Sequence, residues 1–512
     1  MNDTAVYLLP ASTPLLFAVL ALVMQKRPSR WPKAAAALPL VAALASTALL
    51  LTAGPGQSPL LGIVGIGLSI RLDALSATLL LLISFLGFTI LHYSRQYLEG
   101  DARHGVFMRD LALTLAAVSA LVTAGNLYMM IGAWIGMSLL LNRLLIFRAE
   151  RPAARLAARK KFILARAGDA SLLVAFGILI AAFGTADISE LLTLAQSGDN
   201  HSALAVAAGL VAFTAVLKSA QFPTHGWLVE VMETPTPVSA LLHAGIVNAG
   251  GFLFLRFSDF MTAVPGVSLS VAALGGLTAI IGSAIMLSQT NIKSALAYST
   301  VGQMGFMMLQ CGLGAYSAAM VHLVGHSLYK AHAFLSSGDA VRRLSAEGWR
   351  RGVAATNLTS GLFKLALVGA LYALIAQLSG YRWPEDGIII GLGGVLMLGI
   401  WLYLDAPNMG AKPRVTLYVT AAATAVSYFL IQTAAATLYG GLFAAPPVPG
   451  VVAFTLMGAV LVASLAIVLA QGRDPASARW HSLRVHLAQG LYLNIILNRW
   501  LGGFRTRQAN TR

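Results

Sequence analysis

Residues 203–223 read ALAVAAGLVAFTAVLKSAQFP, an apolar run with a lysine near its end and a proline five positions after that lysine. A run of about 20 apolar residues is what an α-helix needs to cross a bilayer. Proline removes a backbone donor and clashes with the preceding turn, so we expect the helix to break close to Lys218. Broken helices at membrane depth face protein or a watery cavity, and they mark transport sites in many carriers. The stretch therefore predicts a membrane bundle with an ionisable group beside a cavity.

The composition extends this interpretation to the whole chain. Its 512 residues are 57% hydrophobic and 11% charged, and the mean hydropathy of +0.76 lies outside the range of soluble domains. The net charge is +16, but the basic residues form short clusters between apolar runs, so nucleic acid is not an expected partner. The single cysteine, Cys311, excludes a disulfide framework and a multi-cysteine metal site.

About fifteen apolar runs approach the length of a span, from Val6–Met24 to Val451–Ala470. The first run is interpreted as a span because no basic segment precedes it, as a signal peptide would require. The loop at 26–33 is basic and, by the positive-inside rule, faces the cytoplasm. The loop at 148–161 is basic again, while the acidic loop at 187–199 lacks Lys and Arg. We expect a multi-pass protein of the cell inner membrane, with a periplasmic N-terminus and a cytoplasmic C-terminus.

Several ionisable residues lie inside the predicted spans, where each costs roughly 2.5–3.5 kcal/mol on insertion scales. Arg166 and Asp169 are three positions apart and share a helix face, so they can pair with each other or with a third charge. A helix is expected to begin at the Thr-Pro-Thr-Pro segment and to run over 234–257, with His243 about two turns inside. Histidine can accept and release a proton near neutral pH.

The run at 315–337 is the richest in titratable groups. His322, His326 and Lys330 follow at i, i+4 and i+8, so they form one polar stripe on a helix. A chain of Lys and His with water between them is what a proton relay needs. The relay candidates are Asp169, Lys218, His243, His322, His326 and Lys330. The supporting candidates are Arg166, Pro223, Lys293 near the start of the preceding span, and Lys364 as a further buried base in the run at 354–378.

Structural alternatives exist for these groups. A buried Lys or His can hydrogen-bond a broken helix or a neighbouring carbonyl, and an Arg166–Asp169 pair can fix packing without moving anything. His322 and His326 have the spacing of a zinc pair, but no nearby carboxylate or Cys completes a ligand set, so neither a metal nor another cofactor is expected in this chain. Soluble-enzyme motifs such as a P-loop, H-E-x-x-H or a nucleophile elbow are absent, which favours a transporter subunit over an enzyme.

Three stretches resemble the antiporter-like subunits of respiratory complex I and of Mrp cation/proton antiporters. They are KSAQFP at 218–223 with Trp227 and PTPVSALLHA at 235–244, RAGD at 166–169, and the segment 293–305 followed by His322, His326 and Lys330. The resemblance covers roughly residues 60–340. It implies an all-α polytopic fold in which two inverted five-helix repeats each contain a broken helix. It also implies that the Lys and His residues at these positions carry protons across the midplane.

The departures from that pattern are informative. The family usually has a glutamate after the Trp of its fifth helix, paired with the lysine of the broken helix, but here Trp134 is followed by Ile135. Asp169 is the nearest matched carboxylate and is expected to replace it as the partner of Lys218. Asn291 stands where complex I subunits commonly have Asp. These differences weaken a role in complex I.

The segments HGW at 225–227, HAGIVNAGGF at 243–252, RVH at 484–486 and GLYLN at 490–494 resemble the DabB subunits of DabA–DabB inorganic carbon pumps. This resemblance implies a DabA-like partner, a zinc protein related to carbonic anhydrases, so that zinc is expected on the partner. It further implies that cation flow through the present subunit drives one-way hydration of CO₂ to bicarbonate on that partner.

The predicted organisation has five parts. They are N-terminal transmembrane helices at 1–105, a first antiporter-like repeat at 106–257, a second at 258–405, C-terminal transmembrane helices at 406–472 and a basic cytoplasmic tail at 473–512. The leading hypothesis is a lipid-embedded subunit that conducts H⁺ or Na⁺ and couples the ion gradient to CO₂ or bicarbonate uptake. One alternative is a proton-translocating subunit of a complex I-like, hydrogenase or Mrp assembly. Another is a non-conducting scaffold for a peripheral partner.

Overall fold

The computed structural model describes residues 4–63, 66–197, 201–338, 358–383, 385–404, 411–447, 450–471 and 478–500. The N-terminal helices are η1 (Thr4–Ala11), α1 (Ser12–Lys26), η2 (Lys33–Ala37), α2 (Leu38–Ala53), α3 (Ala74–Tyr97) and α4 (His104–Val122). Two short antiparallel ladders lie between α2 and α3, pairing β1 (Gly56–Gln57) with β4 (Arg71–Leu72) and β2 (Leu61–Ile63) with β3 (Ile66–Leu68). These ladders are the strands of the described chain, and helices make up the remaining regular structure.

The middle of the chain supplies the helices that carry the first candidate group. They are α5 (Leu127–Leu145), α6 (Pro152–Phe183), α7 (Ile188–Ser197), α8 (His201–Lys218), α9 (Gly226–Glu230), η3 (Val231–Glu233), α10 (Thr236–Ala244), η4 (Ile246–Asn248) and α11 (Ala249–Arg256). The short elements from α9 to η4 replace the continuous helix that a simple span would require. This is the part of the fold in which helices are broken.

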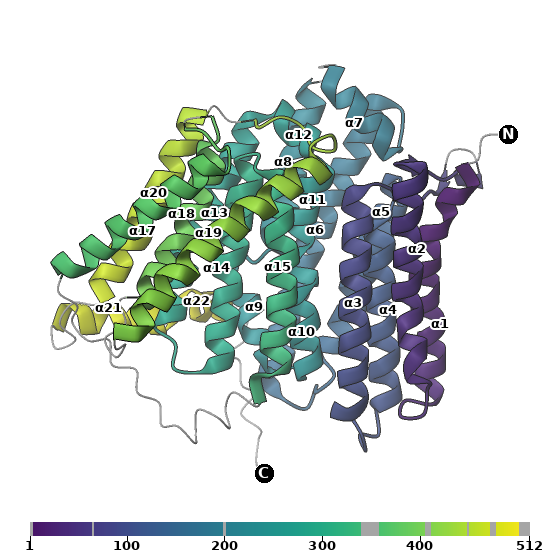
Figure 1. Cartoon of the computed structure of the whole chain (residues 1–512). Coiled ribbons are helices and arrows are strands. Elements are labelled where there is room, and N and C mark those ends of the chain that lie inside the picture. The colour runs from purple at the N-terminus through teal and green to yellow at the C-terminus, as the bar shows by residue number, and fades with distance from the viewer. Residues whose placement is uncertain are drawn as a thin grey trace, which may run out of the picture.

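The next helices are α12 (Ser258–Ala263), α13 (Pro265–Leu287), α14 (Ile292–Gly312), α15 (Tyr316–Leu335), α17 (Leu358–Leu378), α18 (Gly387–Leu404), α19 (Ala411–Tyr439) and α20 (Gly450–Gln471). The described part of the tail contains α21 (Ala478–Ala488), η5 (Gly490–Tyr492) and α22 (Leu493–Trp500). In Figure 1, α1 to α4 form one flank of the bundle, α17, α18 and α20 form the other, and α19 runs from that second flank across the middle of the bundle. Helix α7 lies at one end of the bundle, and α21 lies at the opposite end.

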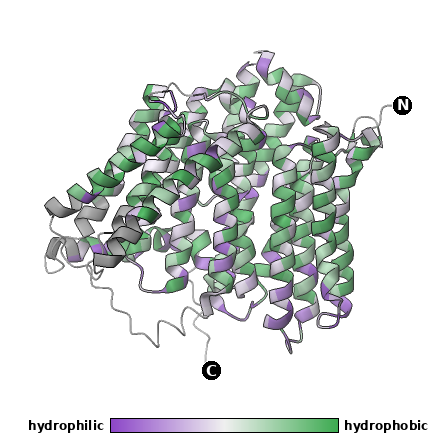
Figure 2. Ribbon diagram, viewed as in Figure 1, coloured by the Kyte–Doolittle hydropathy of each residue, from purple (hydrophilic) through white to green (hydrophobic). Residues whose placement is uncertain are grey.

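The prediction of an all-α polytopic membrane bundle is confirmed. Within the described ranges, ten helices are long and apolar enough to cross a membrane, and α17, α18 and α20 contain shorter apolar stretches. Figure 2 shows apolar residues along the helices and hydrophilic residues mostly toward the ends of the bundle. This distribution suits a bilayer, because lipid offers no hydrogen-bonding partners to polar groups.

Helix α6 begins earlier than the sequence analysis predicts. The charge pattern predicts a basic loop at 152–161, but this segment forms the first turns of the helix, and Lys160 and Lys161 are buried. Pro152 favours a helix start at this point, and the Ala, Arg and Lys residues that follow are good helix formers. Both lysines have polar partners inside the bundle. The cluster of basic residues is therefore the N-terminal end of a helix and not a loop.

Helices α13 and α14 pack with their backbones unusually close. A Cβ added to Gly275 would lie 2.5 Å from the backbone nitrogen of Leu309, and one added to Gly282 would lie 2.7 Å from that of Gly302. Small residues permit such an approach in membrane bundles, where packing replaces the hydrophobic effect between helices. Packing of α13 on α14 holds Thr300 and Gln310 of α14 close to the histidines of α10 and α15.

Candidate functional site

The first broken helix ends at Lys218, as predicted. Helix α8 stops at this residue, the backbone takes a left-handed conformation at Ala220 (φ 49°), and Pro223 lies in the turn before α9. Lys218 is only 7% exposed, so its ammonium lies inside the protein. Next to it, the hydroxyl of Ser219 donates to the backbone oxygen of Val247 at 3.1 Å.

Asp169 is held by two other residues. Its Oδ1 accepts a hydrogen bond from Trp134 Nε1 at 2.9 Å, and its Oδ2 forms an ion pair with the guanidinium of Arg166. The i, i+3 spacing predicted the second contact. The Nζ of Lys218 lies over the face of the same Trp134, 4.8 Å from the ring centroid. One indole therefore contacts the carboxylate with its edge and the ammonium with its face.

The expected pairing of Asp169 with Lys218 is indirect. Within the described residues, no ion pair joins the two side chains, and Lys218 Nζ has no hydrogen-bond partner. Both residues instead line one cavity of about 20 Å³, together with Trp134, Lys161 and Trp227. A polar cavity of this size can hold about one water molecule. The geometry suits a contact between acid and base that passes through water or the indole.

The second group lies on α15. His322 Nδ1 is 2.7 Å from the side-chain oxygen of Gln310, while neither ring nitrogen of His326 has a hydrogen-bond partner among the described residues. The Nζ of Lys330 donates to the backbone oxygen of Leu296 at 2.9 Å and to the hydroxyl of Ser299. Both histidines line a cavity of about 590 Å³ formed by residues of α13 to α15 and α18 to α20. The two histidines of the stripe thus border a cavity large enough to hold water, whereas Lys330 is not among its lining residues.

His243 lies at a second break, which the sequence analysis placed inside a continuous helix. Helix α10 ends at Ala244, one residue later, and η4 follows Gly245 before α11 begins. The Nδ1 of His243 is 3.0 Å from the hydroxyl of Thr300, and its ring stacks on Phe334 with centroids 4.5 Å apart. The break brings His243 against both α14 and α15.

The segment η4 connects the two groups. Ser219, which follows Lys218, donates to Val247, and the side-chain amide of Asn248 donates to the hydroxyl of Ser327 at 2.8 Å. Ser327 follows His326 on α15. The chain neighbours of the broken-helix lysine and of the central histidine are therefore joined through two consecutive residues of η4.

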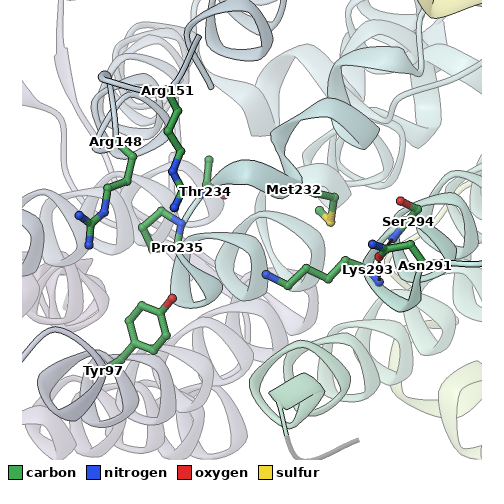
Figure 3. Close-up of a pocket in the computed structure, with 9 residues that line it drawn as sticks. All are labelled: Tyr97, Arg148, Arg151, Met232, Thr234, Pro235, Asn291, Lys293 and Ser294. Atoms are coloured by element: carbon green, nitrogen blue, oxygen red, sulfur yellow. Dashed lines mark hydrogen bonds between the residues drawn. The ribbon is translucent and has the colours of Figure 1, made fainter. Parts of the chain in front are cut away.

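Lys293 does not join the stripe. It lies in the first turn of α14 and lines a polar pocket of about 440 Å³ together with Arg148 and Arg151. Figure 3 shows its side chain extending across this pocket, away from Asn291. Asn291 caps α14, since its side-chain oxygen accepts from the backbone N–H of Lys293 at 2.8 Å. An amide can thus replace the aspartate expected at this position, because the cap needs an acceptor and not a charge.

Lys364 is half-buried on α17 and is not among the residues lining the cavities of the two groups. In the described part of the chain, no three His, Cys, Asp or Glu residues come together in a way that could hold a metal ion.

The sequence analysis does not identify the two buried lysines of α6 as candidate site residues. Lys161 Nζ donates to the backbone oxygen of Ser138 at 3.0 Å, and Lys160 pairs with Glu230. Helix propensity through 152–161 is the signal that could have revealed them.

Comparison with known proteins places the chain among membrane subunits. The family model described as "NADH:quinone oxidoreductase/Mrp antiporter, TM" matches residues 124–401, and the one described as "NADH-Ubiquinone oxidoreductase (complex I), chain 5 N-terminus" matches residues 61–108. The chain is 38% identical over 465 residues to the probable inorganic carbon transporter subunit DabB2 of Halothiobacillus neapolitanus, covering 88% of this chain and 82% of that protein.

Two further relatives show that both inorganic carbon transporter subunits and NADH-quinone oxidoreductase subunits are similar to this chain. The probable inorganic carbon transporter subunit DabB of Hydrogenovibrio crunogenus is 37% identical over 356 residues, covering 64% of this chain and 68% of that protein. The NADH-quinone oxidoreductase subunit L of Escherichia coli K12 is 32% identical over 452 residues, covering 86% of this chain and 72% of that protein.

Solved structures agree on the fold. A chain of the Mrp complex from Dietzia sp. superposes with a TM-score of 0.59 at 24% identity, covering 97% of this chain and 57% of that one. A chain of an archaeal membrane-bound sulfane sulfur reductase superposes with a TM-score of 0.57 at 18% identity, covering 98% of this chain and 99% of that one. At these identities the likeness concerns the arrangement of helices.

Proposed function

Because the chain belongs to the NADH:quinone oxidoreductase/Mrp antiporter family of membrane subunits and is of the DabB type, we propose that it conducts protons to drive inorganic carbon uptake. Protons pass between the Asp169–Lys218 group and the stripe of His322, His326 and Lys330. The relatives named as inorganic carbon transporter subunits support inorganic carbon as the transported cargo. The buried titratable groups support H⁺ as the conducted ion.

The observation that carries the proposal is the environment of Lys218. Its ammonium is buried at the end of a broken helix, stabilised by the face of Trp134 and beside a cavity, without a direct ion pair to Asp169. A lysine locked in a direct buried pair loses strong Coulomb energy when it gives up its proton. A lysine held by a ring face and a nearby carboxylate exchanges its proton at a lower cost.

The second group provides the onward path. A neutral imidazole accepts a proton on one nitrogen while it donates from the other. His326 has both nitrogens available at the edge of the 590 Å³ cavity, and His322 has one nitrogen bound to Gln310 and one available. His243 and Lys330 flank them from α10 and the end of α15. Nitrogen bases of this kind favour H⁺ over Na⁺, which prefers oxygen ligands.

Membership of the DabB type also supports a membrane location and a partner subunit. We place this subunit in the cell inner membrane, with its N-terminus in the periplasm and its C-terminus in the cytoplasm, bound to a DabA-like partner. Any zinc and any hydration of CO₂ belong to that partner. The relatives named as subunits of inorganic carbon transporters support a partner of this kind.

The test is growth of a carbonic-anhydrase-deficient host at ambient CO₂, with this subunit and its partner expressed together. Lys218→Ala and Asp169→Ala are expected to abolish rescue while the amount of protein in the membrane stays unchanged. Lys26→Ala, at an exposed end of α1, is the matched control and should rescue fully. Normal growth with both site variants would remove the relay.

A second candidate is a proton-translocating subunit of a complex I-like or Mrp assembly. The similarity to the Escherichia coli subunit L over 86% of this chain favours it. Purification from the native membrane separates the two candidates. A carbonic-anhydrase-related zinc protein in the same fraction supports the first, and a set of redox or antiporter subunits supports the second.

A further inference from the structure

A buried ion pair lies close to the first group but outside it. The Nζ of Lys160 on α6 is 2.8 Å from Glu230 Oε2 at the end of α9, and the Lys160 side chain is 0% exposed. The other oxygen, Glu230 Oε1, accepts a hydrogen bond from the side-chain amide of Asn498 on α22 at 2.8 Å. Three segments that are far apart in the sequence thus meet at one carboxylate.

Two short stretches of backbone connect this pair to the first group. On α6, Lys160 contacts Glu230 while its neighbour Lys161 lines the cavity of Lys218 and Asp169. On α9, Trp227 lines that same cavity, and Glu230 follows three positions later, which places the two on one face of the helix. The pair and the cavity are therefore about one helical turn apart.

The C-terminal segment, residues 478–500, covers the pair. The side chain of Asn494 occupies the space where Gly226 would carry a Cβ, so α22 can approach α9 closely. Gln289, two residues after the end of α13, donates to the backbone oxygen of Ala488 at 3.2 Å, which fixes the end of α21 beside the end of α13. In Figure 1 this segment lies at the end of the bundle opposite α7.

Exposure differs between the two members of the pair. The Glu230 side chain is 21% exposed, whereas Lys160 is sealed. His225, which precedes α9, is also buried, and its ring lies 6.0 Å from that of Tyr298 on α14. A proton that arrives from water meets the carboxylate first and the lysine next, in the direction of the cavity.

We propose that the Lys160–Glu230 pair is a third proton-exchange site, through which the Asp169–Lys218 group communicates with the aqueous face beneath the C-terminal segment, and that Asn498 holds this site closed. The inference rests on the proposed function of proton conduction. When α22 lifts away, Glu230 loses its amide partner and gains water, and a proton passes to Lys160. The competing explanation is an ion pair that only fixes α6 against α9.

The two explanations differ when the pair is replaced by apolar residues. A purely structural buried pair can be exchanged for hydrophobic side chains of similar volume with little loss of folding. Lys160→Met combined with Glu230→Leu is therefore expected to keep the protein folded and in the membrane. If the pair exchanges protons, the double variant loses conduction. If the pair only packs, the double variant conducts normally.

The experiment measures proton flux in vesicles that contain the full complex, with a pH-sensitive dye inside and a potassium diffusion potential as the driving force. Glu230→Gln and the double variant are expected to lower the flux by about a hundredfold, the lower end of what a positioned proton-transfer group contributes. Asn498→Ala is expected to raise it severalfold. The matched controls are Glu99→Gln and Gln489→Ala, both at exposed positions.

Lys218→Ala in the same vesicles separates the inference from the function on which it rests. Flux that is lost in Lys218→Ala but normal in Glu230→Gln and in the double variant overturns the third site. Flux in Asn498→Ala equal to that of the wild type overturns the closing role of the C-terminal segment. A wild type and Lys218→Ala that conduct equally would instead reject the proposed function itself.

Discussion

The ammonium of Lys218 lies over the indole of Trp134, with the nitrogen 4.8 Å from the ring centroid. The same indole donates its N–H to Asp169 at 2.9 Å. A cation over a ring face is stabilised by the ring quadrupole, and a hydrogen bond to a carboxylate fixes the plane of the ring. Trp134 therefore sets the distance between the acid and the base of the first group.

Trp134→Phe tests whether the N–H has this role. The variant keeps an aromatic face under Lys218 and removes the donor to Asp169, and hydrogen bonds to charged groups are worth about 1.5–3 kcal/mol. Proton flux in vesicles is expected to fall by roughly tenfold or more, since 1.4 kcal/mol is a factor of ten.

Trp227→Phe is the matched control for that change. Trp227 lines the same cavity, but its N–H has no hydrogen-bond partner among the described residues. The control loses no bond and is expected to conduct like the wild type. Equal losses in both variants would mean that indole volume, and not the bond to Asp169, is what matters.

His326 and His322 are expected to respond differently to replacement by glutamine. His326 makes no hydrogen bond with the described residues, so His326→Gln should leave thermal stability unchanged and abolish proton flux. His322→Gln breaks the contact with Gln310 and should lower both flux and stability. The checks are vesicle flux and thermal unfolding in detergent. A His326→Gln protein that conducts normally would remove the central member of the stripe.

Much of this site was predictable from local sequence. The break at Lys218 follows from Pro223, and the stripe follows from the i, i+4, i+8 spacing of its three members, because both depend on helix geometry alone. The contact of Trp134 with Asp169 was not predictable. It joins α5 to α6, and its existence depends on how two helices are rotated against each other.

The Lys160–Glu230 pair shows a different limit. Clusters of Lys and Arg between apolar runs usually mark cytoplasmic loops, and Arg148 does lie in a loop, between α5 and α6. It fails at Lys160 because the partner carboxylate comes from α9, after the broken helix, and the amide of Asn498 comes from the far end of the chain. A topology rule based on charge cannot detect a partner that only the folded chain supplies.

Gly275→Ala tests the close packing of α13 on α14. The new methyl group would lie 2.5 Å from the backbone nitrogen of Leu309, so the helices must separate, and overpacking of this kind typically costs about 1–3 kcal/mol. A lower midpoint of thermal unfolding in detergent is expected. Gly177→Ala on α6, where nothing lies within 4 Å of the added atom, is the control. Equal midpoints in the two variants would contradict the tight contact.

A buried charge cluster outside the two groups ties the start of α3 to the end of α11. Asp73 pairs with Arg256 at 2.5 Å and with Arg71 at 2.8 Å, and it caps α3 by accepting from the backbone N–H of Ser76 at 2.8 Å. Burial opposes ionisation of Asp73, but the two guanidinium groups and the capping bond together hold the pKa of its carboxyl well below its usual range.

Asp73→Asn is expected to lower the thermal midpoint by several degrees, because breaking a buried pair leaves Arg256 without its counter-charge, a loss of roughly 3–5 kcal/mol. The pKa of Asp73 is lower in the folded state than the value of about 3.9 in unfolded chains, so its stabilisation is complete above that pH and is lost as the pH falls toward the folded value. The difference between wild type and variant should therefore be equal at pH 8 and pH 5 and should shrink below about pH 4. Asp101→Asn, which breaks a more exposed pair with Arg148, should change the midpoint little at either pH. A wild-type advantage that already declines between pH 8 and pH 5 would show that this carboxyl is not held ionised by its two arginines.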